Sequence, residues 1–336
     1  MTELKDLGMQ MSMEQFQPDV GLEQVLLEER AGFDSVWVSD HFLPWFHTNA
    51  ACGFAWTFIA SCAQATKKIK FGTGITCPTL RYNPGLVAQA FATLNYMYKD
   101  RIFLSVATGE ALNEIPLGYN WPSYLERVHR LEEAIEVIRK LWSGELVSFK
   151  GNYYKLNKAK LYTPPRSKIP IFVAASGPTV AELSGRVGDG FLTAGAPEDT
   201  YKNVLFPALE KGLRASNRSF DSIDRSIELW MSYDKDPVKA LKSVRPWAGS
   251  LLPVFYKMGV YDPREIEAHG NFVGDEQLAK YWTIGASSEP FIKMIEKYVR
   301  LGFNQVHITS SSPDQRNFIE LFGKEVLPYF KSNIRK

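Results

Sequence analysis

Ser35-Val36-Trp37-Val38, followed at once by Ser39-Asp40-His41, is the stretch that most constrains the fold of this chain. A short β-prone run that ends in titratable groups is typical of a buried strand whose carboxyl end borders a binding site. His41 supplies a proton carrier, Asp40 an orienting carboxylate, and Trp45 an aromatic wall. A strand that stops at a polar turn explains the same residues, so this stretch alone leaves both interpretations open.

Similar β-rich runs recur along the chain, separated by helical patterns. Eight runs are present, at residues 7–11, 35–38, 69–75, 101–107, 169–174, 190–194, 226–233 and 305–309. Helical spacing of apolar residues is found at residues 21–31, 84–98, 124–142, 180–187, 200–216 and 289–301. The count favours an α/β fold, a (β/α)8 TIM barrel forming a single domain over residues 1–336. A doubly wound open sheet has the same alternation and remains the alternative.

Two stretches interrupt the alternation and are expected to be insertions. Residues 147–156 place a Gly-Asn turn between two alternating segments, which predicts a β-hairpin. Residues 237–277 contain helix-like pieces punctuated by prolines and are longer than a connection requires. Long excursions of this kind tend to close over the catalytic face of a barrel, so we expect a lid.

Composition excludes several classes of protein. Hydrophobic residues make up 45% and charged residues 23% of the chain, and no run approaches the length of a membrane span. The start of the sequence has no visible export signal, which favours a cytoplasmic location. The 39 basic and 37 acidic residues are interspersed, so nucleic acid is not an expected partner. Three cysteines without paired spacing argue against a disulfide framework, and no histidine spacing indicates a metal site.

Residues just past the expected strands are the candidates for chemistry, because barrel enzymes carry their sites there. Glu14 follows the first strand, and Trp230 lies within the seventh. Glu110 follows the fourth, either as an acid or base in a partly apolar pocket or as a helix N-terminal acid. Ser176-Gly177-Pro178-Thr179 precedes a helix, either as an anion cradle or as a simple capped turn.

Four motifs together give the chain a recognisable family resemblance. They are Ser39 to Trp45, Cys77-Pro78-Thr79-Leu80-Arg81-Tyr82-Asn83-Pro84, Gly109-Glu110-Ala111-Leu112-Asn113-Glu114 and Ser176-Gly177-Pro178. In this order they resemble the coenzyme F420-dependent dehydrogenases of the bacterial luciferase-like superfamily, and the similarity runs almost end to end. The resemblance implies a (β/α)8 barrel, a bound F420 deazaflavin, a homodimer and hydride transfer from an alcohol carbon to C5 of the deazaflavin.

The resemblance also implies roles for individual residues. His41 and Glu110 match the catalytic pair, and which of them is the base stays open. Trp45 would pack against the substrate and hold it beside the deazaflavin ring. The peptide bond Gly74-Ile75 matches a non-prolyl cis peptide beneath the deazaflavin ring. Positions matching the coenzyme site are Asp40, Gly74, Ile75, Cys77, Thr108, Gly109, Asn113, Ser176, Gly177, Thr179 and Val180.

The substrate is expected to be a small molecule contacted by Glu14, Trp45, Trp230 and Lys257. Sugar-phosphate enzymes of this group hold the phosphate with several cations, of which Lys257 alone has a match. The loop Thr193-Ala194-Gly195-Ala196-Pro197 has lost the Thr and the Lys that those enzymes use there to hold the phosphate. Tyr281 stands where they place Arg. Trp230 and residues 247–253 look more like the secondary alcohol dehydrogenase. A small secondary alcohol is therefore placed first, glucose 6-phosphate or a related sugar phosphate second, and a flavin-dependent luciferase-like monooxygenase third.

Overall fold

Eight parallel strands form a nearly closed barrel in the computed structural model, which describes residues 3–333. Neighbouring strands follow the order β3-β2-β1-β11-β9-β8-β7-β4. Isolated bridges from Phe71 to Ile102 and from Thr76 to Val106 bring β3 and β4 together and complete the ring. The barrel strands are β1 (Asp6–Met11), β2 (Ser35–Val38), β3 (Lys70–Thr73), β4 (Leu104–Val106), β7 (Ile171–Ala174), β8 (Gly190–Ala194), β9 (Asp224–Tyr233) and β11 (Gln305–Ser310).

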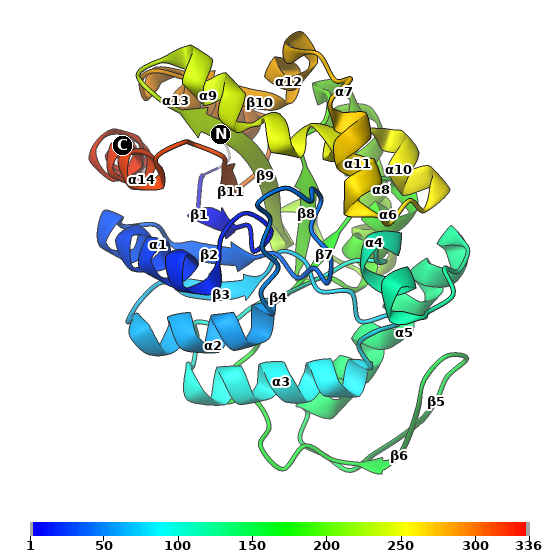
Figure 1. Cartoon of the computed structure of the whole chain (residues 1–336). Helices are drawn as coiled ribbons and strands as arrows, with labels where there is room; N and C mark the ends of the chain where they lie inside the picture. Colours follow the sequence, from blue (N-terminus) through cyan, green and yellow to red (C-terminus); the bar gives the residue numbers. More distant parts are fainter. Residues whose placement is uncertain (1–2, 334–336) are drawn as a thin grey trace.

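Helices surround this barrel (Figure 1), so its strands are covered on both sides. All six residues of β1 and all four of β2 are buried, as expected for parallel strands between a packed interior and a helical layer. The helices outside the insertion are α1 (Pro18–Ala31), α2 (Ala55–Ala65), α3 (Pro84–Met97), α4 (Ala111–Glu114), α5 (Tyr124–Trp142), α6 (Pro178–Val187), α7 (Glu198–Thr200), α8 (Phe206–Ala215), α13 (Glu289–Leu301), α14 (Gln315–Leu321) and α15 (Leu327–Asn333). The predicted α/β barrel is confirmed.

A two-stranded antiparallel hairpin projects from the barrel, formed by β5 (Val147–Lys150) and β6 (Lys155–Ala159). Glu133 of α5 holds its turn by accepting hydrogen bonds from three consecutive backbone N–H groups, those of residues 152–154. The Tyr154 hydroxyl then donates to the Thr79 carbonyl at 2.8 Å, which ties the hairpin to the loop after β3. The hairpin therefore supports a loop at the carboxyl end of the barrel.

Short helices fill the segment after β9: α9 (Pro237–Ser243), the 3-10 helix η4 (Arg245–Leu251), α10 (Pro253–Met258), α11 (Pro263–Gly270) and α12 (Asp275–Tyr281). Their apolar side chains form a separate cluster with Trp45, in the loop after β2, and Leu112, in α4. Glu267 of α11 also accepts hydrogen bonds from the backbone N–H groups of His47 and Thr48. The segment thus lies against the loops that carry the candidate catalytic residues.

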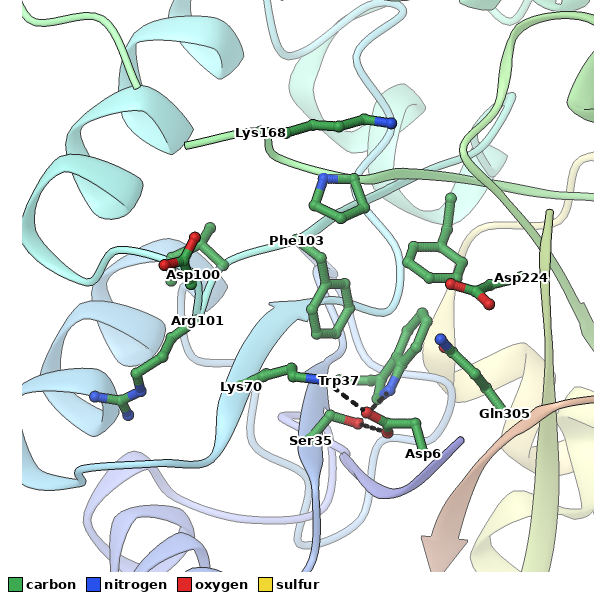
Figure 2. Close-up of a pocket in the computed structure, with 13 residues that line it drawn as sticks. Asp6, Ser35, Trp37, Lys70, Asp100, Arg101, Phe103, Lys168, Asp224 and Gln305 are labelled. Carbon is green, nitrogen blue, oxygen red and sulfur yellow. Dashed lines mark hydrogen bonds and ion pairs between the residues drawn. The ribbon is translucent and has the colours of Figure 1, made fainter. Parts of the chain in front are cut away.

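A cavity of about 260 Å³ opens at the amino-terminal end of the barrel, where Trp37, Phe103 and Phe172 meet charged side chains (Figure 2). In it the Ser35 hydroxyl donates to Asp6, whose other oxygen lies 3.6 Å from Lys70 Nζ. Burial raises the pKa of Asp6 to about 6. No candidate site residue lines this cavity. Within residues 3–333, no helix has the length and apolar character needed to cross a bilayer.

Candidate active site

His41 lies between two carboxylates that come from different strands. Its Nε2 is 3.5 Å from Glu14 Oε1 and 3.7 Å from Glu110 Oε2. Glu14 follows β1, His41 follows β2 and Glu110 follows β4, so parallel strands bring three distant positions to one end of the barrel. The His41 side chain is 12% exposed, the Glu14 side chain 3% and the Glu110 side chain 32%. Glu110 is therefore the most accessible of the three to a ligand.

The two carboxylates have different surroundings. Glu14 Oε2 accepts a hydrogen bond from the Ser39 hydroxyl, which itself accepts from the Met13 backbone N–H at 2.8 Å. The Ser39 hydroxyl therefore links the Glu14 carboxyl group to the backbone of the loop after β1. Burial raises the pKa of Glu110, a positive charge on His41 would oppose that rise, and the negative charge of Glu14 adds to it. A raised pKa makes the ionised Glu110 a stronger proton acceptor than an ordinary carboxylate.

Asp40, beside the imidazole, is surrounded by protein donors. Its Oδ1 accepts from the Tyr82 hydroxyl at 2.9 Å and from Arg81 Nη2 at 3.2 Å. Its Oδ2 accepts from the Thr76 hydroxyl and from the indole N–H of Trp56 at 3.2 Å. Asp40 is 1% exposed. These partners hold the loop that carries His41, and the coenzyme contact that the resemblance implies for Asp40 stays a prediction.

Arg81 links that loop to the one that carries Glu110. Its Nη2 donates to the Asp40 carbonyl, its Nε lies 3.7 Å from Glu114 Oε1, and its backbone N–H donates to Glu114 Oε2 at 2.8 Å. Burial raises the pKa of Glu114 to about 7, against the opposing influence of Arg81. The sequence analysis gave Arg81 no role, although its motif was part of the resemblance. Its partners lie too far away along the chain for spacing to reveal them.

Aromatic rings border the carboxylates. The Trp45 ring centroid is 5.9 Å from that of His41 and 5.0 Å from that of Tyr256 in α10. The ring centroid of Trp230, on β9, lies 6.1 Å from that of Trp282 and 6.3 Å from that of Tyr281. The indole N–H of Trp230 donates to Glu228 at 2.9 Å.

These rings share an electrostatic environment with the catalytic candidates. Burial raises the pKa of Glu228, and the charges of Glu14 and Glu110 add to that rise. Tyr256 has a raised pKa from burial and from the charges of Glu110 and Glu228. Trp45, Trp230 and Tyr256 thus form an aromatic border around an acidic centre. Sequence reasoning gave no role to Tyr256 or Glu228.

The residues expected around the coenzyme form two groups. In the first, Gly109 has φ 95°, a conformation that favours glycine, and the Thr79 hydroxyl beneath it is buried without a protein partner. Cys77 is buried nearby in the chain, Thr108 is partly exposed, and the peptide between Gly74 and Ile75 is cis. An unpaired hydroxyl beside a glycine suits a ligand that approaches the backbone closely.

The second group lies at the start of α6. Ser176 and Thr179 are exposed, Gly177 is the N-terminal cap without a side-chain hydrogen bond, and Val180 is buried below. A side chain at Gly177 would meet no atom closer than 4.0 Å, where the Tyr124 hydroxyl lies. An open helix N-terminus suits a phosphate, which is one feature of the F420 tail. Each group has chemistry that suits one part of a deazaflavin with an anionic tail, and their contacts with the coenzyme stay a prediction.

Two further predictions concern ligands. The backbone of Lys257 lies in α10, and its side chain lies outside the described part of the structure. Among the residues that the structure describes, no three His, Cys, Asp or Glu side chains are arranged to hold a metal ion.

Comparison with known proteins places this arrangement in a family. The sequence matches the luciferase-like monooxygenase family over residues 4–305. The chain belongs to this family. A solved structure, an F420-dependent secondary alcohol dehydrogenase in complex with an F420–acetone adduct, superposes on this luciferase-like chain with a TM-score of 0.92 and 41% identity, covering 96% of this chain and 98% of that one.

Curated relatives of this luciferase-like chain are named F420-dependent glucose-6-phosphate dehydrogenases. The protein from Intrasporangium calvum is 43% identical over 96% of this chain and 98% of its own length. The protein from Mycobacterium tuberculosis H37Rv is 42% identical over 98% of each. The resemblance to F420-dependent dehydrogenases is thereby confirmed. The names of these relatives agree better with the sugar-phosphate alternative than with the small alcohol that the sequence analysis placed first.

Proposed function

We propose that this chain is an F420-dependent dehydrogenase that oxidises the carbinol group of an alcohol or sugar phosphate to a carbonyl. The observation that carries the proposal is the imidazole of His41 held between Glu14 and Glu110, at the same end of the barrel as the Gly109 turn and the start of α6. Alcohol oxidation needs a proton acceptor next to a hydride acceptor; this end of the barrel offers the proton acceptor, and the coenzyme would supply the hydride acceptor.

The protein's part in the reaction is binding, orientation and proton transfer. Coenzyme F420, when bound, supplies C5 of its deazaflavin as the hydride acceptor. Thr108, Gly109 and Asn113 would border its ring system, and Ser176, Gly177 and Thr179 its phosphate. Trp45 and Trp230 would exclude water and orient the substrate, while His41 and Glu110 hold or accept the hydroxyl proton.

A sugar 6-phosphate is our first candidate substrate. It is supported by relatives at 42–43% identity over nearly the whole chain that carry this name. Lys257, in α10, matches one of the phosphate-binding cations of the sugar-phosphate enzymes by resemblance. Glucose 6-phosphate is therefore the compound to assay first.

A small secondary alcohol is the second candidate, and specific residues favour it. Tyr281 borders Trp230 at the position where the sugar-phosphate enzymes carry Arg. Residues 194–197 contain no cation, and a single lysine serves a phosphate dianion poorly. The likeness to the secondary alcohol dehydrogenase, at 41% identity, points the same way.

An anaerobic assay with oxidised F420 separates these substrates. The purified chain is mixed with the coenzyme and either glucose 6-phosphate or isopropanol, and loss of the visible F420 absorbance is followed. We expect bleaching with one of them, faster with the sugar phosphate if the first candidate holds. Turnover that requires oxygen and a flavin, with no F420 bleaching by either compound, would instead identify a monooxygenase. Homodimeric assembly remains a prediction from the resemblance, and a cytoplasmic location remains a prediction from the sequence.

A further inference from the structure

Asn113 contacts both His41 and Glu110 in the candidate site, and both the oxygen and the nitrogen of its side-chain amide have protein partners. Its Oδ1 accepts a hydrogen bond from the Phe42 backbone N–H at 2.8 Å. Its Nδ2 lies 3.5 Å from His41 Nδ1 and 3.4 Å from Glu110 Oε2. Asn113 is 2% exposed, so these protein groups form its surroundings.

The orientation of this amide follows from its partner on the backbone. An N–H group donates and cannot accept, so the Asn113 atom that faces Phe42 must be the oxygen. The nitrogen then faces His41 and Glu110, with one of its two hydrogens available for each. A nitrogen that donates to His41 Nδ1 requires a lone pair there.

We propose that Asn113 is a positioning residue that sets the tautomer of His41. The neutral imidazole keeps its lone pair at Nδ1, toward the Asn113 amide, and its proton at Nε2, toward Glu14 and Glu110. In the imidazolium form, the N–H group at His41 Nδ1 would face the N–H group of Asn113 Nδ2, and neither could accept a hydrogen bond from the other. The charged groups facing His41 are Glu14 from the loop after β1 and Glu110 from the loop after β4.

This assignment has a consequence for proton transfer, which rests on the proposed function. A neutral His41 that already carries a proton on Nε2 acts there as a donor, so it stabilises the substrate oxygen and leaves the hydroxyl proton to a carboxylate. Glu14 is buried and already bonded to Ser39, whereas Glu110 is partly exposed. With F420 bound as the hydride acceptor, Glu110 would take the hydroxyl proton as the O–H and C–H bonds break and the C=O bond forms, and the hydride would leave with its electron pair to the oxidised coenzyme.

Nitrogen NMR of the coenzyme-free protein tests the tautomer directly. The chain is labelled with ¹⁵N-histidine, and the His41 signals are assigned by their loss in His41→Gln. In long-range ¹H–¹⁵N spectra, protonated and unprotonated ring nitrogens have distinct shifts. When the His41 ring is neutral, we expect Nε2 to carry the proton and Nδ1 to be unprotonated. A protonated Nδ1 in the neutral ring would overturn the proposal.

Asn113→Asp provides the matched perturbation. The carboxylate keeps an acceptor for Phe42 and replaces the donor toward His41 by a second acceptor, so the proton should move to Nδ1. The His41 titration midpoint should also rise by about one pH unit or more. Asn95→Asp is the control: it makes the same substitution at a fully buried asparagine of α3, which bonds Arg166 and Ser167. We expect it to leave His41 unchanged, and an equal shift in both variants would contradict a specific role for Asn113.

The NMR measurements need neither coenzyme nor substrate, so they distinguish this proposal from the proposed function. A chain that shows the expected tautomer but never bleaches F420 would leave the positioning role intact and reject the activity. If F420 is reduced, kcat for Asn113→Asp should fall and the midpoint of its pH profile should move with the His41 titration. A loss of kcat without such a movement would indicate a merely structural role and count against the proposal.

Discussion

The place of some residues at this site could be predicted from their position just past a strand, whereas the contacts of others could not be predicted from the sequence. Glu14, His41 and Glu110 each stand just past a β-rich run, so the barrel rule predicts that they share one end of the molecule. The Asp40–Arg81 contact joins positions 41 apart in the sequence, and no local pattern encodes it. The same holds for Asn113, whose contact with His41 spans 72 positions. Sequence thus indicates the reactive groups, and packing determines how they are oriented.

Arg81 is the residue on which we expect stability to depend most directly. Its side chain is 4% exposed between Asp40 and Glu114. Arg81→Met would leave two buried carboxylates without their cation, which costs roughly 3–5 kcal/mol of unfolding free energy. Arg186→Met is the control, because Arg186 pairs with Glu132 while 40% exposed and should cost no more than about 1 kcal/mol. Urea denaturation measures both, and equal losses would contradict the assigned importance of Arg81.

Whole elements were predictable where their periodicity is regular. All eight barrel strands were predicted, to within a few residues at their ends. α2 (Ala55–Ala65) was not predicted, although Thr57, Ser61 and Gln64 form an exposed polar face; three polar positions within eleven mostly apolar residues give a weak pattern. β10 (Trp282–Gly285) was also missed, since it pairs with β9 beside the barrel, and a four-residue edge strand gives little signal.

The insertion between β9 and β10 depends on one close backbone approach. A Cβ on Gly249 would lie 2.4 Å from the Ile266 carbonyl oxygen, so Gly249→Ala must push η4 and α11 apart, at about 1–3 kcal/mol. Trp45 packs in the same cluster, so kcat/KM should also fall, by up to about 100-fold. Gly274→Ala is the control, because its Cβ would meet nothing within 4 Å. Hydrogen exchange over residues 245–281 should accelerate in the first variant; unchanged exchange would argue against the close contact.

At the scale of the whole molecule, the helical layer contains a carboxyl group that couples folding to pH. Glu28 of α1 is 1% exposed, its Oε2 has no hydrogen-bond partner, and burial raises its pKa to about 8. The unfolded chain releases this proton at a lower pH than the folded protein does. The stability it contributes is therefore complete below the ordinary value of 4.5 and is lost as the pH rises through about 8.

Glu28→Gln should remove this dependence. Between about pH 5 and pH 8 the native protein should lose on the order of 3–4 kcal/mol of unfolding free energy through Glu28, and the variant should show a flatter profile.

Glu29→Gln is the matched control, because the contribution of Glu29 to stability should depend on pH in the opposite direction. Burial raises the pKa of Glu29, but hydrogen bonds from the backbone N–H groups of Lys67, Lys68 and Ile69 lower it on balance. Its contribution is present above the unfolded pKa and lost as the pH falls, so its removal should cost stability at neutral pH. Denaturation curves across this range measure both variants, and a native profile retained in Glu28→Gln would show that another buried group, such as Asp6, governs the pH dependence.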